Sequence, residues 1–471
     1  MALLTLASCQ QHNLPYPADG LHLSADTVLF DTVFTTKGST TSQFKIYNPT
    51  PSTVVIKRIR LQDGTRFMVN VDGETDLDAL QNYPISSQDS LYVFVKVFID
   101  PQNSDSPVLV EDRLLIETDE RQDSVVLCAY GQDVRLLKDL HVTSDSTFTK
   151  GKPYLVLRSL AVDSACRLTI DKGCIFYMGD SAQMVVRGEL CVNGTLDEPV
   201  IFRGARLYHI YNKVPYDYIS GLWNGIFLLH GESDHTPHHR LEYTDIHGAN
   251  VGLYCQAPDQ HKLPSLQISN SRIHNHSVYG LVMQNFDSHV VNTEISNCAS
   301  YCVYLAGGNH CFTHNTIASY FNSSSVILHS VSRDNVSAVF VNNLSKNNAR
   351  TVMEMTNNII SGSGRQNFTL ATPLPDLYTG HFRNNCIKAD SISFSSFTDN
   401  YFIKPLDTLF VNTYFNRDKE YYYDFSLDSA SVALGMALRD SALAYPLDRL
   451  GNPRLSDEAP DAGCYERQEA P

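Results

Sequence analysis

The feature that most constrains the fold is a repeat of short apolar segments, with a period near 22 residues, between about Leu140 and about Leu409. Its clearest marker is an isoleucine preceded by a polar pair, which recurs at gaps of 27, 22, 22, 43 and 27 residues. These markers are Ile246, Ile273, Ile295, Ile317, Ile360 and Ile387. The gap of 43 is interpreted as two coils, one of them degenerate in sequence. Three short β segments in each repeat are typical of a parallel β-helix, so these isoleucines are predicted to stack in one interior row.

Apolar triplets at tighter spacing precede this region and follow the same period. Leu168 and Leu190 open two of them and lie 22 residues apart, with a turn at Asp171-Lys172-Gly173. Successive side chains of a strand point to opposite faces, so each triplet supplies two inward apolar side chains. The coils are therefore predicted to begin well before Ile246.

Asparagines stand just before the recurring isoleucines, at a place where each coil would turn a corner. They are Asn292, Asn315, Asn357, Asn358, Asn384 and Asn385. Asparagine tolerates a left-handed turn and can bond to an equivalent residue on the next coil. The favoured interpretation is a ladder of stacked asparagines, and the alternative is a set of polar groups that binds sugar.

The region before the repeat has a different pattern, in which short strands alternate apolar and polar residues between turns. The predicted strands include residues 44–47, 54–61, 91–99, 114–116 and 125–129. About seven such strands in about a hundred residues are typical of an immunoglobulin-like β-sandwich. The predicted fold class is therefore all-β, a right-handed parallel β-helix preceded by that sandwich.

The pattern divides the chain into four parts. Residues 1–20 are a signal remnant and tether, 21–135 the sandwich, 136–415 the β-helix and 416–471 a C-terminal capping segment. Tyr421 to Tyr423 in the last part are expected to pack over the final coil, because an open end would expose unpaired strand edges.

Charge and cysteine content exclude several functions. The chain carries 36 Lys and Arg against 51 Asp and Glu, a net charge of −15, which opposes binding to nucleic acid. Its 11 cysteines form no metal-ligand array, and Cys174, Cys191, Cys302 and Cys311 lie in apolar strand-like segments, which indicates small buried residues. No metal or cofactor is expected.

The N-terminus reads Leu6-Ala7-Ser8-Cys9 after a short apolar segment. This resembles the lipobox of bacterial lipoproteins, in which the cysteine becomes the lipidated first residue of the mature chain. Cys9 is therefore the expected lipidation site, although the apolar segment is shorter than usual and lacks a preceding basic region. The start codon is expected to lie further upstream.

Several segments together resemble a right-handed β-helix family of bacterial surface lipoproteins, within the pectate-lyase-like superfamily. The segments in the β-helix region are residues 153–155, 168–173, 188–195, 199–202 and Gly221-Leu222-Trp223-Asn224-Gly225-Ile226. Those in the sandwich region are residues 30–34, 47–49, 72–73, 89–92 and 129–132. Those in the tail are residues 451–454 and 460–466. The tail departs from the family pattern by placing Cys464 where alanine is usual. The resemblance implies a cell-surface setting, but its superfamily includes lyases, hydrolases and adhesive proteins.

The densest cluster of groups that could perform catalysis is Asp234-His235-Thr236-Pro237-His238-His239, followed by Asp245 and His247, with His274 and His276 one coil later. Histidine and aspartate at this density can bind a divalent metal or serve as acid and base, and His238, His239 and Asp245 are the candidate catalytic residues. The alternative is a polar loop, since adjacent histidines on a strand point to opposite faces. Asp245, Arg272 and Glu294 occupy matching positions of successive coils and are predicted to form an outward charge ladder.

An aromatic-rich insertion between coils offers rings that could stack on sugars. Tyr211, Tyr216, Tyr218 and Trp223 are the candidate carbohydrate-binding residues. The alternative is a loop that folds down over the flank of the helix.

The expected function is that of a noncatalytic surface lipoprotein, anchored to the outer membrane by its lipid alone, that binds polysaccharide or another envelope component. One alternative is a polysaccharide lyase or glycoside hydrolase that acts on acidic polysaccharide. Another is a structural or adhesive surface protein.

Overall fold

The computed structural model divides into two compact units, Met1–Val134 and Arg135–Pro471. It describes residues 20–35, 37–64, 66–207, 209–210, 214–231, 236–259, 262–321, 337–342, 348–371, 375–389, 397–414, 423–456 and 459–468. In these residues no helix is long and apolar enough to cross a membrane.

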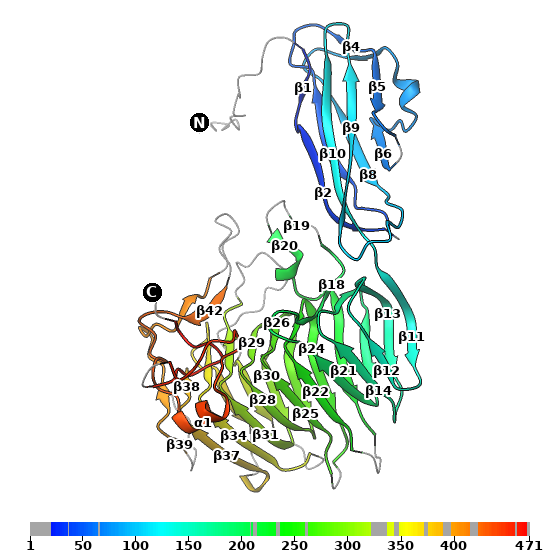
Figure 1. The fold of residues 1–471 in the computed structure, drawn as a ribbon. Helices are drawn as coiled ribbons and strands as arrows, with labels where there is room; N and C mark the ends of the chain where they lie inside the picture. Colours follow the sequence, from blue (N-terminus) through cyan, green and yellow to red (C-terminus); the bar gives the residue numbers. More distant parts are fainter. Residues whose placement is uncertain are drawn as a thin grey trace, which may run out of the picture. The chain divides into compact units, whose positions relative to one another are not determined.

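The first unit is an immunoglobulin-like β-sandwich of two four-stranded sheets (Figure 1). One sheet has the strand order β1 (His22–Leu23), β3 (Ser42–Tyr47), β8 (Ser90–Val97), β6 (Phe67–Val71). The other has the order β2 (Thr27–Phe34), β10 (Gln122–Gln132), β9 (Val108–Glu117), β5 (Arg58–Leu61). In addition, β4 (Val54–Ile56) pairs with β7 (Tyr83–Ile85), and the short helix η1 is Leu77–Leu80. Alternate residues of each strand fill the core, as Val93, Val95 and Val97 do. The predicted strand at 54–61 is two strands, because β4 pairs with β7 whereas β5 pairs with β9.

The second unit is a parallel β-helix. Its strands form a 10-stranded parallel sheet, here called sheet 1, and an 18-stranded sheet that opens with β11 (Arg135–Val142) and β13 (Tyr154–Val162). Beyond β13 the 18-stranded sheet continues as two series of paired strands, here called sheets 2 and 3. Sheet 1 contains β12 (Ser146–Phe148), β14 (Arg167–Asp171), β17 (Glu189–Asn193), β22 (His238–Glu242), β25 (Ser265–Ser269), β28 (Asp287–Val291), β31 (Gly308–Thr313), β34 (Thr351–Thr356), β37 (Tyr378–Arg383) and β39 (Phe397–Thr398). Sheet 2 contains β15 (Ile175–Met178), β18 (Val200–Gly204), β23 (Thr244–His247), β26 (Arg272–His276), β29 (Glu294–Cys298), β32 (Thr316–Ser319), β35 (Ile359–Gly362), β38 (Cys386–Ile387) and β40 (Tyr401–Phe402). Sheet 3 contains β16 (Gln183–Val186), β21 (Trp223–Leu229), β24 (Ala249–Gln256), β27 (Tyr279–Gln284), β30 (Val303–Ala306), β33 (Val339–Asn342) and β36 (Phe368–Ala371).

The predicted isoleucine row is confirmed. Each marker from Ile246 to Ile387 is the registered partner of the next, and all six side chains are fully buried. The interpretation of the 43-residue gap was wrong, because Ile317 pairs directly with Ile360. That gap is a single coil with insertions between its strands. An insertion and a degenerate coil of equal length cannot be told apart by spacing alone.

The asparagines form the predicted ladder: three of the six are its continuous rungs, and Asn292 donates from Nδ2 to Oδ1 of Asn270 on the preceding coil at 3.2 Å. The Nδ2 groups of Asn315, Asn358 and Asn385 each donate to the Oδ1 atom of the next asparagine, at 2.8–2.9 Å, and Asn400 is the last acceptor. The other three, Asn292, Asn357 and Asn384, have positive φ angles of 47°, 60° and 51° and turn the corner between sheets 1 and 2.

The C-terminal segment lies along this corner and covers the outer face of sheet 2. Asn292, Asn357 and Asn384 donate from Nδ2 to the carbonyls of Leu447, Leu438 and Met436. The segment includes β41 (Phe410–Asn412), β42 (Asp424–Leu427) and α1 (Arg439–Ala444), and its apolar side chains form a small core with Ala318, Ile359 and Cys386 of sheet 2. The remaining short elements are β19 (His209–Ile210), β20 (Val214–Pro215), η2 (Tyr216–Tyr218) and η3 (Pro375–Leu377).

The ten cysteines in the described part of the chain are free thiols. Cys174 and Cys302 are buried, as expected from their apolar surroundings, whereas Cys191 and Cys311 are only half-buried. The last two lie on the outer face of sheet 1, where no other element covers them fully.

Candidate functional site

The structure does not bring His238, His239 and Asp245 together. His238 and His239 are neighbours on β22 and point to opposite faces, so His238 is exposed and His239 lies in the interior. Burial, with His230 next to it, lowers the pKa of His239 to about 3, and its Nδ1 accepts a hydrogen bond from the Leu190 backbone. Asp245 lies on a different sheet. These three residues therefore share no face of the β-helix on which they could form one catalytic site.

The aromatic insertion is only partly a surface feature. Trp223 is 1% exposed, packs in the interior of the β-helix and donates from Nε1 to the His247 carbonyl. Its ring therefore has no free face for a sugar, which corrects the expectation for this residue. Tyr216 is buried in η2 and Tyr218 is half-buried. Tyr211 and the candidate lipidation site Cys9 lie outside the described residues.

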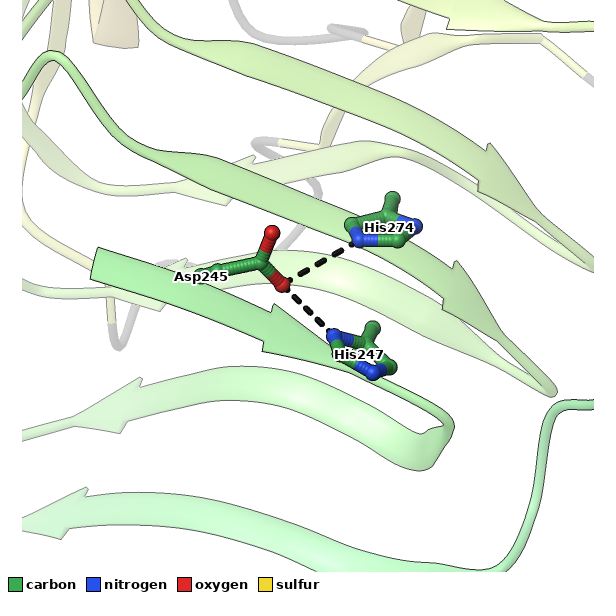
Figure 2. Close-up of side chains that lie close together, drawn as sticks. All are labelled: Asp245, His247 and His274. Atoms are coloured by element: carbon green, nitrogen blue, oxygen red, sulfur yellow. Dashed lines mark hydrogen bonds and ion pairs between the residues drawn. The ribbon is translucent and has the colours of Figure 1, made fainter. Parts of the chain in front are cut away.

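Asp245 belongs to a different cluster, on the outer face of sheet 2 (Figure 2). Its Oδ1 atom lies 2.6 Å from Nδ1 of His247 and 3.2 Å from Nε2 of His274. Asp245 and His247 are two apart on β23 and so share a face, while His274 is the registered partner of His247 on β26. The two imidazole rings stack with centroids 4.9 Å apart.

The insertion after β18 completes this cluster from outside. Asp217 of η2 places Oδ1 3.2 Å from Nε2 of His247, and Arg203 lies 2.5 Å from the same carboxylate oxygen. The η2 turn is itself held to sheet 2, because Asn275 donates from Nδ2 to the Asp217 carbonyl. His247 thus stands between two carboxylates, one at each ring nitrogen.

Burial and neighbouring charges act in opposite directions on the pKa values of the cluster. Burial disfavours the cationic form of His247, but the carboxylates of Asp245 and Asp217 outweigh it and raise its pKa. Burial also opposes ionisation of Asp245, yet His274 and His247 hold its pKa well below the usual range. For His274, burial and the nearby Arg272 prevail and lower the pKa to about 4. At neutral pH, His274 is uncharged and Asp245 is ionised.

The charge ladder predicted from Asp245, Arg272 and Glu294 is present in register. Arg272 donates from Nε to Oε1 of Glu294 at 3.0 Å. The Glu294 end of the ladder is covered, however: the Glu294 side chain is 2% exposed, and the Tyr465 hydroxyl of the C-terminal segment donates to it. The side chains of Arg272 and Asp245 are 29% and 23% exposed. An outward ladder was expected to face solvent, and the C-terminal segment that buries its Glu294 end was not anticipated.

The outer face of sheet 1, unlike that of sheet 2, is left mostly open by the C-terminal segment. A row of mainly polar side chains runs along it, one from each successive strand: Thr169, Cys191, Arg240, Gln267, His289, Cys311, Glu354 and His381. A groove of about 380 Å³ crosses the middle of the row and is lined by Gln267, Asp287, His289, Asn309 and Glu354, among others. A smaller hollow of about 240 Å³ continues it past His381.

In the sequence, Asp245, His247 and His274 fall in one dense cluster, but the predicted partners of Asp245 are His238 and His239, and not His247 and His274. The isoleucine row contained that signal, because pairing Ile246 with Ile273 also pairs the residues that follow them. Asp217 was missed for a different reason. It comes from an insertion, whose position over sheet 2 no repeat specifies.

The fold and these faces define an all-β protein with an immunoglobulin-like sandwich and a parallel β-helix. No family model and no curated protein sequence matches the chain. Among solved structures, the ASH / PapD-like domain of human CEP192 (PapD-like domain 7) matches with a TM-score of 0.18 and 10% identity, over 28% of this chain and 97% of that domain. A likeness this weak carries no argument about function.

Proposed function

We propose that the protein is a noncatalytic surface lipoprotein that binds a glycan, or a comparably polar envelope component, along the outer face of sheet 1. The observation that carries the proposal is the groove on that face, which crosses the row of mainly polar side chains. Strands of a sheet lie about 4.8 Å apart, so the row offers hydrogen-bonding groups at a regular spacing along an extended ligand.

The chemistry of the groove suits a neutral or weakly charged polymer. Gln267 and Asn309 are exposed amides, which both donate and accept hydrogen bonds, as sugar hydroxyls also do. Asp287 accepts from the backbone and side chain of Asn309 at 2.8 and 2.9 Å, which holds that amide in place. At the groove wall the Tyr445 hydroxyl lies 3.1 Å from Nε2 of His289.

Binding is favoured over catalysis because the candidate catalytic residues lie on different faces. His238 is the only one of the three on the outer face of sheet 1, where it lies 2.7 Å from the Ser265 hydroxyl. Neither His239 nor Asp245 reaches that face. The enzyme remains the second hypothesis, and an adhesive protein the third.

A glycan array probed with the purified protein, followed by calorimetry on any hit, tests the proposal. We expect saturable binding that falls at least tenfold in a Gln267→Ala/Asn309→Ala double variant. Gln256→Ala is the matched control, because it removes an exposed strand glutamine from sheet 3. Binding that survives the double variant, or no binding to any glycan, would overturn the proposal.

The same incubations separate the alternatives. Release of unsaturated uronates or new reducing ends would make the protein a lyase or hydrolase. Absence of both binding and products would favour the adhesive protein.

Attachment to the outer membrane is proposed from Cys9 alone. Metabolic labelling with radioactive palmitate in a bacterial host should label the wild-type chain and not a Cys9→Ser variant. Equal labelling of both would remove the anchor from the proposal.

A further inference from the structure

We propose that Asp245, His247 and His274 bind one divalent transition-metal ion of the zinc class on the outer face of sheet 2. Their three ligand atoms lie within 4.8 Å of one another. This site is independent of the glycan groove, which lies on sheet 1.

The spacing of the three groups fits metal coordination. Ligand atoms bonded to zinc at about 2.0–2.1 Å in a tetrahedron are separated by about 3.3 Å. Oδ1 of Asp245 is 2.6 Å from one imidazole nitrogen and 3.2 Å from the other, and the two imidazole nitrogens lie within 4.8 Å of each other, so side-chain rotations can bring all three atoms to such separations. The backbone needs no change, since β23 and β26 are already paired.

The exposure of the cluster suits a site that binds from solvent. The side chains of His247 and His274 are 9% and 7% exposed, while that of Asp245 is 23% exposed. The imidazoles are therefore fixed by packing, and the carboxylate reaches solvent. Three protein ligands with an open side leave a fourth position for water.

The surroundings of His247 match those of a metal-bound histidine. Such a histidine usually donates its second ring N–H to a carboxylate, which fixes the tautomer and orients the ring. Asp217 occupies that position at Nε2 of His247, and Arg203 holds Asp217. With the proton on Nε2, the Nδ1 lone pair points toward Asp245 and His274.

The ligand set selects the class of metal. Two imidazole nitrogens and one carboxylate suit zinc and similar first-row ions, whereas calcium and magnesium prefer an all-oxygen shell. A bound ion would also fasten the η2 insertion to sheet 2, because Asp217 contacts one of its ligands.

The test uses the full, untagged chain after chelator treatment, titrated with ZnCl₂ in a calorimeter and with CoCl₂ in a spectrophotometer. We expect one zinc ion per chain and visible cobalt absorption typical of low coordination number. Asp245→Asn, which keeps the side-chain volume, should abolish both signals. Asp217→Asn should weaken zinc binding about 10- to 100-fold without changing the stoichiometry.

His238→Ala is the matched control, because it removes an exposed histidine from the neighbouring sheet. Circular dichroism on each variant establishes that it is folded, and His274→Gln replaces Asp245→Asn if the latter does not fold. Zinc uptake that is absent in the wild type, unchanged in Asp245→Asn, or lost in His238→Ala would overturn the proposal.

Discussion

The outer faces of sheets 1 and 2 are built on the same coils and both carry an ion pair between charged side chains, but the exposure of these pairs differs. On sheet 1, Arg240 lies 3.5 Å from Glu242 with side chains 50% and 37% exposed. On sheet 2, Arg272 lies 3.0 Å from Glu294, whose side chain is almost fully buried. Water solvates the first pair, whereas the second pair depends on protein partners.

The difference comes from what lies over each face, and not from the coils themselves. The C-terminal segment and the η2 insertion both cover sheet 2. A covered charge must be fully partnered, because desolvation costs several kcal/mol for each ion. An exposed pair contributes little, and its side chains are free to bind a ligand. The covered face is therefore expected to govern stability, and the open face recognition.

The largest effect is expected from breaking a buried charge pair within the C-terminal segment that covers sheet 2. Arg454 is fully buried, donates to Glu466 at 3.2 Å and to the Asn292 side chain at 2.9 Å. Arg454→Met leaves the Glu466 carboxylate buried without its cation. We expect the free energy of unfolding, measured in urea, to fall by about 3–5 kcal/mol.

The control is the same substitution on the open face. Arg240→Met should cost less than about 1 kcal/mol, because its ion pair is exposed. Adding Glu466→Gln to Arg454→Met should recover part of the loss. Equal losses for the two single variants would show that the cover does not distinguish the faces.

A somewhat smaller loss is expected at the corner between the two faces. Oδ1 of Asn358 accepts from the backbone and the side chain of Asn315, both at 2.9 Å, in a fully buried position. Asn358→Ala leaves these donors unsatisfied and should cost about 2–4 kcal/mol in the same urea experiment. Asn309→Ala, an exposed asparagine on sheet 1, should change stability by less than about 0.5 kcal/mol. A small loss at Asn358 would mean that water replaces the ladder bonds.

The ladder and the isoleucine row could be predicted from sequence because each coil repeats the same local geometry. Once Ile246 is paired with Ile273, the residues around them are paired as well. The same logic places Arg272 over Asp245, and it could have placed His274 over His247. The contacts that repeat in every coil could therefore be predicted from the sequence.

The cover could not be predicted, because it does not repeat. Asp217 and Tyr465 reach sheet 2 from segments whose spacing follows no period, and their contacts depend on tertiary packing alone. The interior position of Trp223 could not be predicted for a similar reason. A single aromatic residue near a coil boundary has two possible faces, and only the register of β21 with β24 decides between them.

The smallest change in the free energy of unfolding is expected for a histidine on the inner side of sheet 1, in comparison with one on its outer side, and it depends on pH. His310 is buried on the inner side, where desolvation lowers its pKa to about 4. Between pH 6.5 and 4 the unfolded chain binds this proton and the folded chain does not, so stability falls as the pH falls. Each pH unit in that range costs at most about 1.4 kcal/mol. Because the unfolded histidine is only half protonated at pH 6.5, His310→Met, which copies its registered neighbour Met353, should reduce the loss between pH 6.5 and 4.5 by about 2 kcal/mol. Urea unfolding at several pH values measures the difference, with His381→Met on the exposed outer side as the control. An equal change of slope in both variants would show that burial within sheet 1 does not set the proton affinity of its histidines.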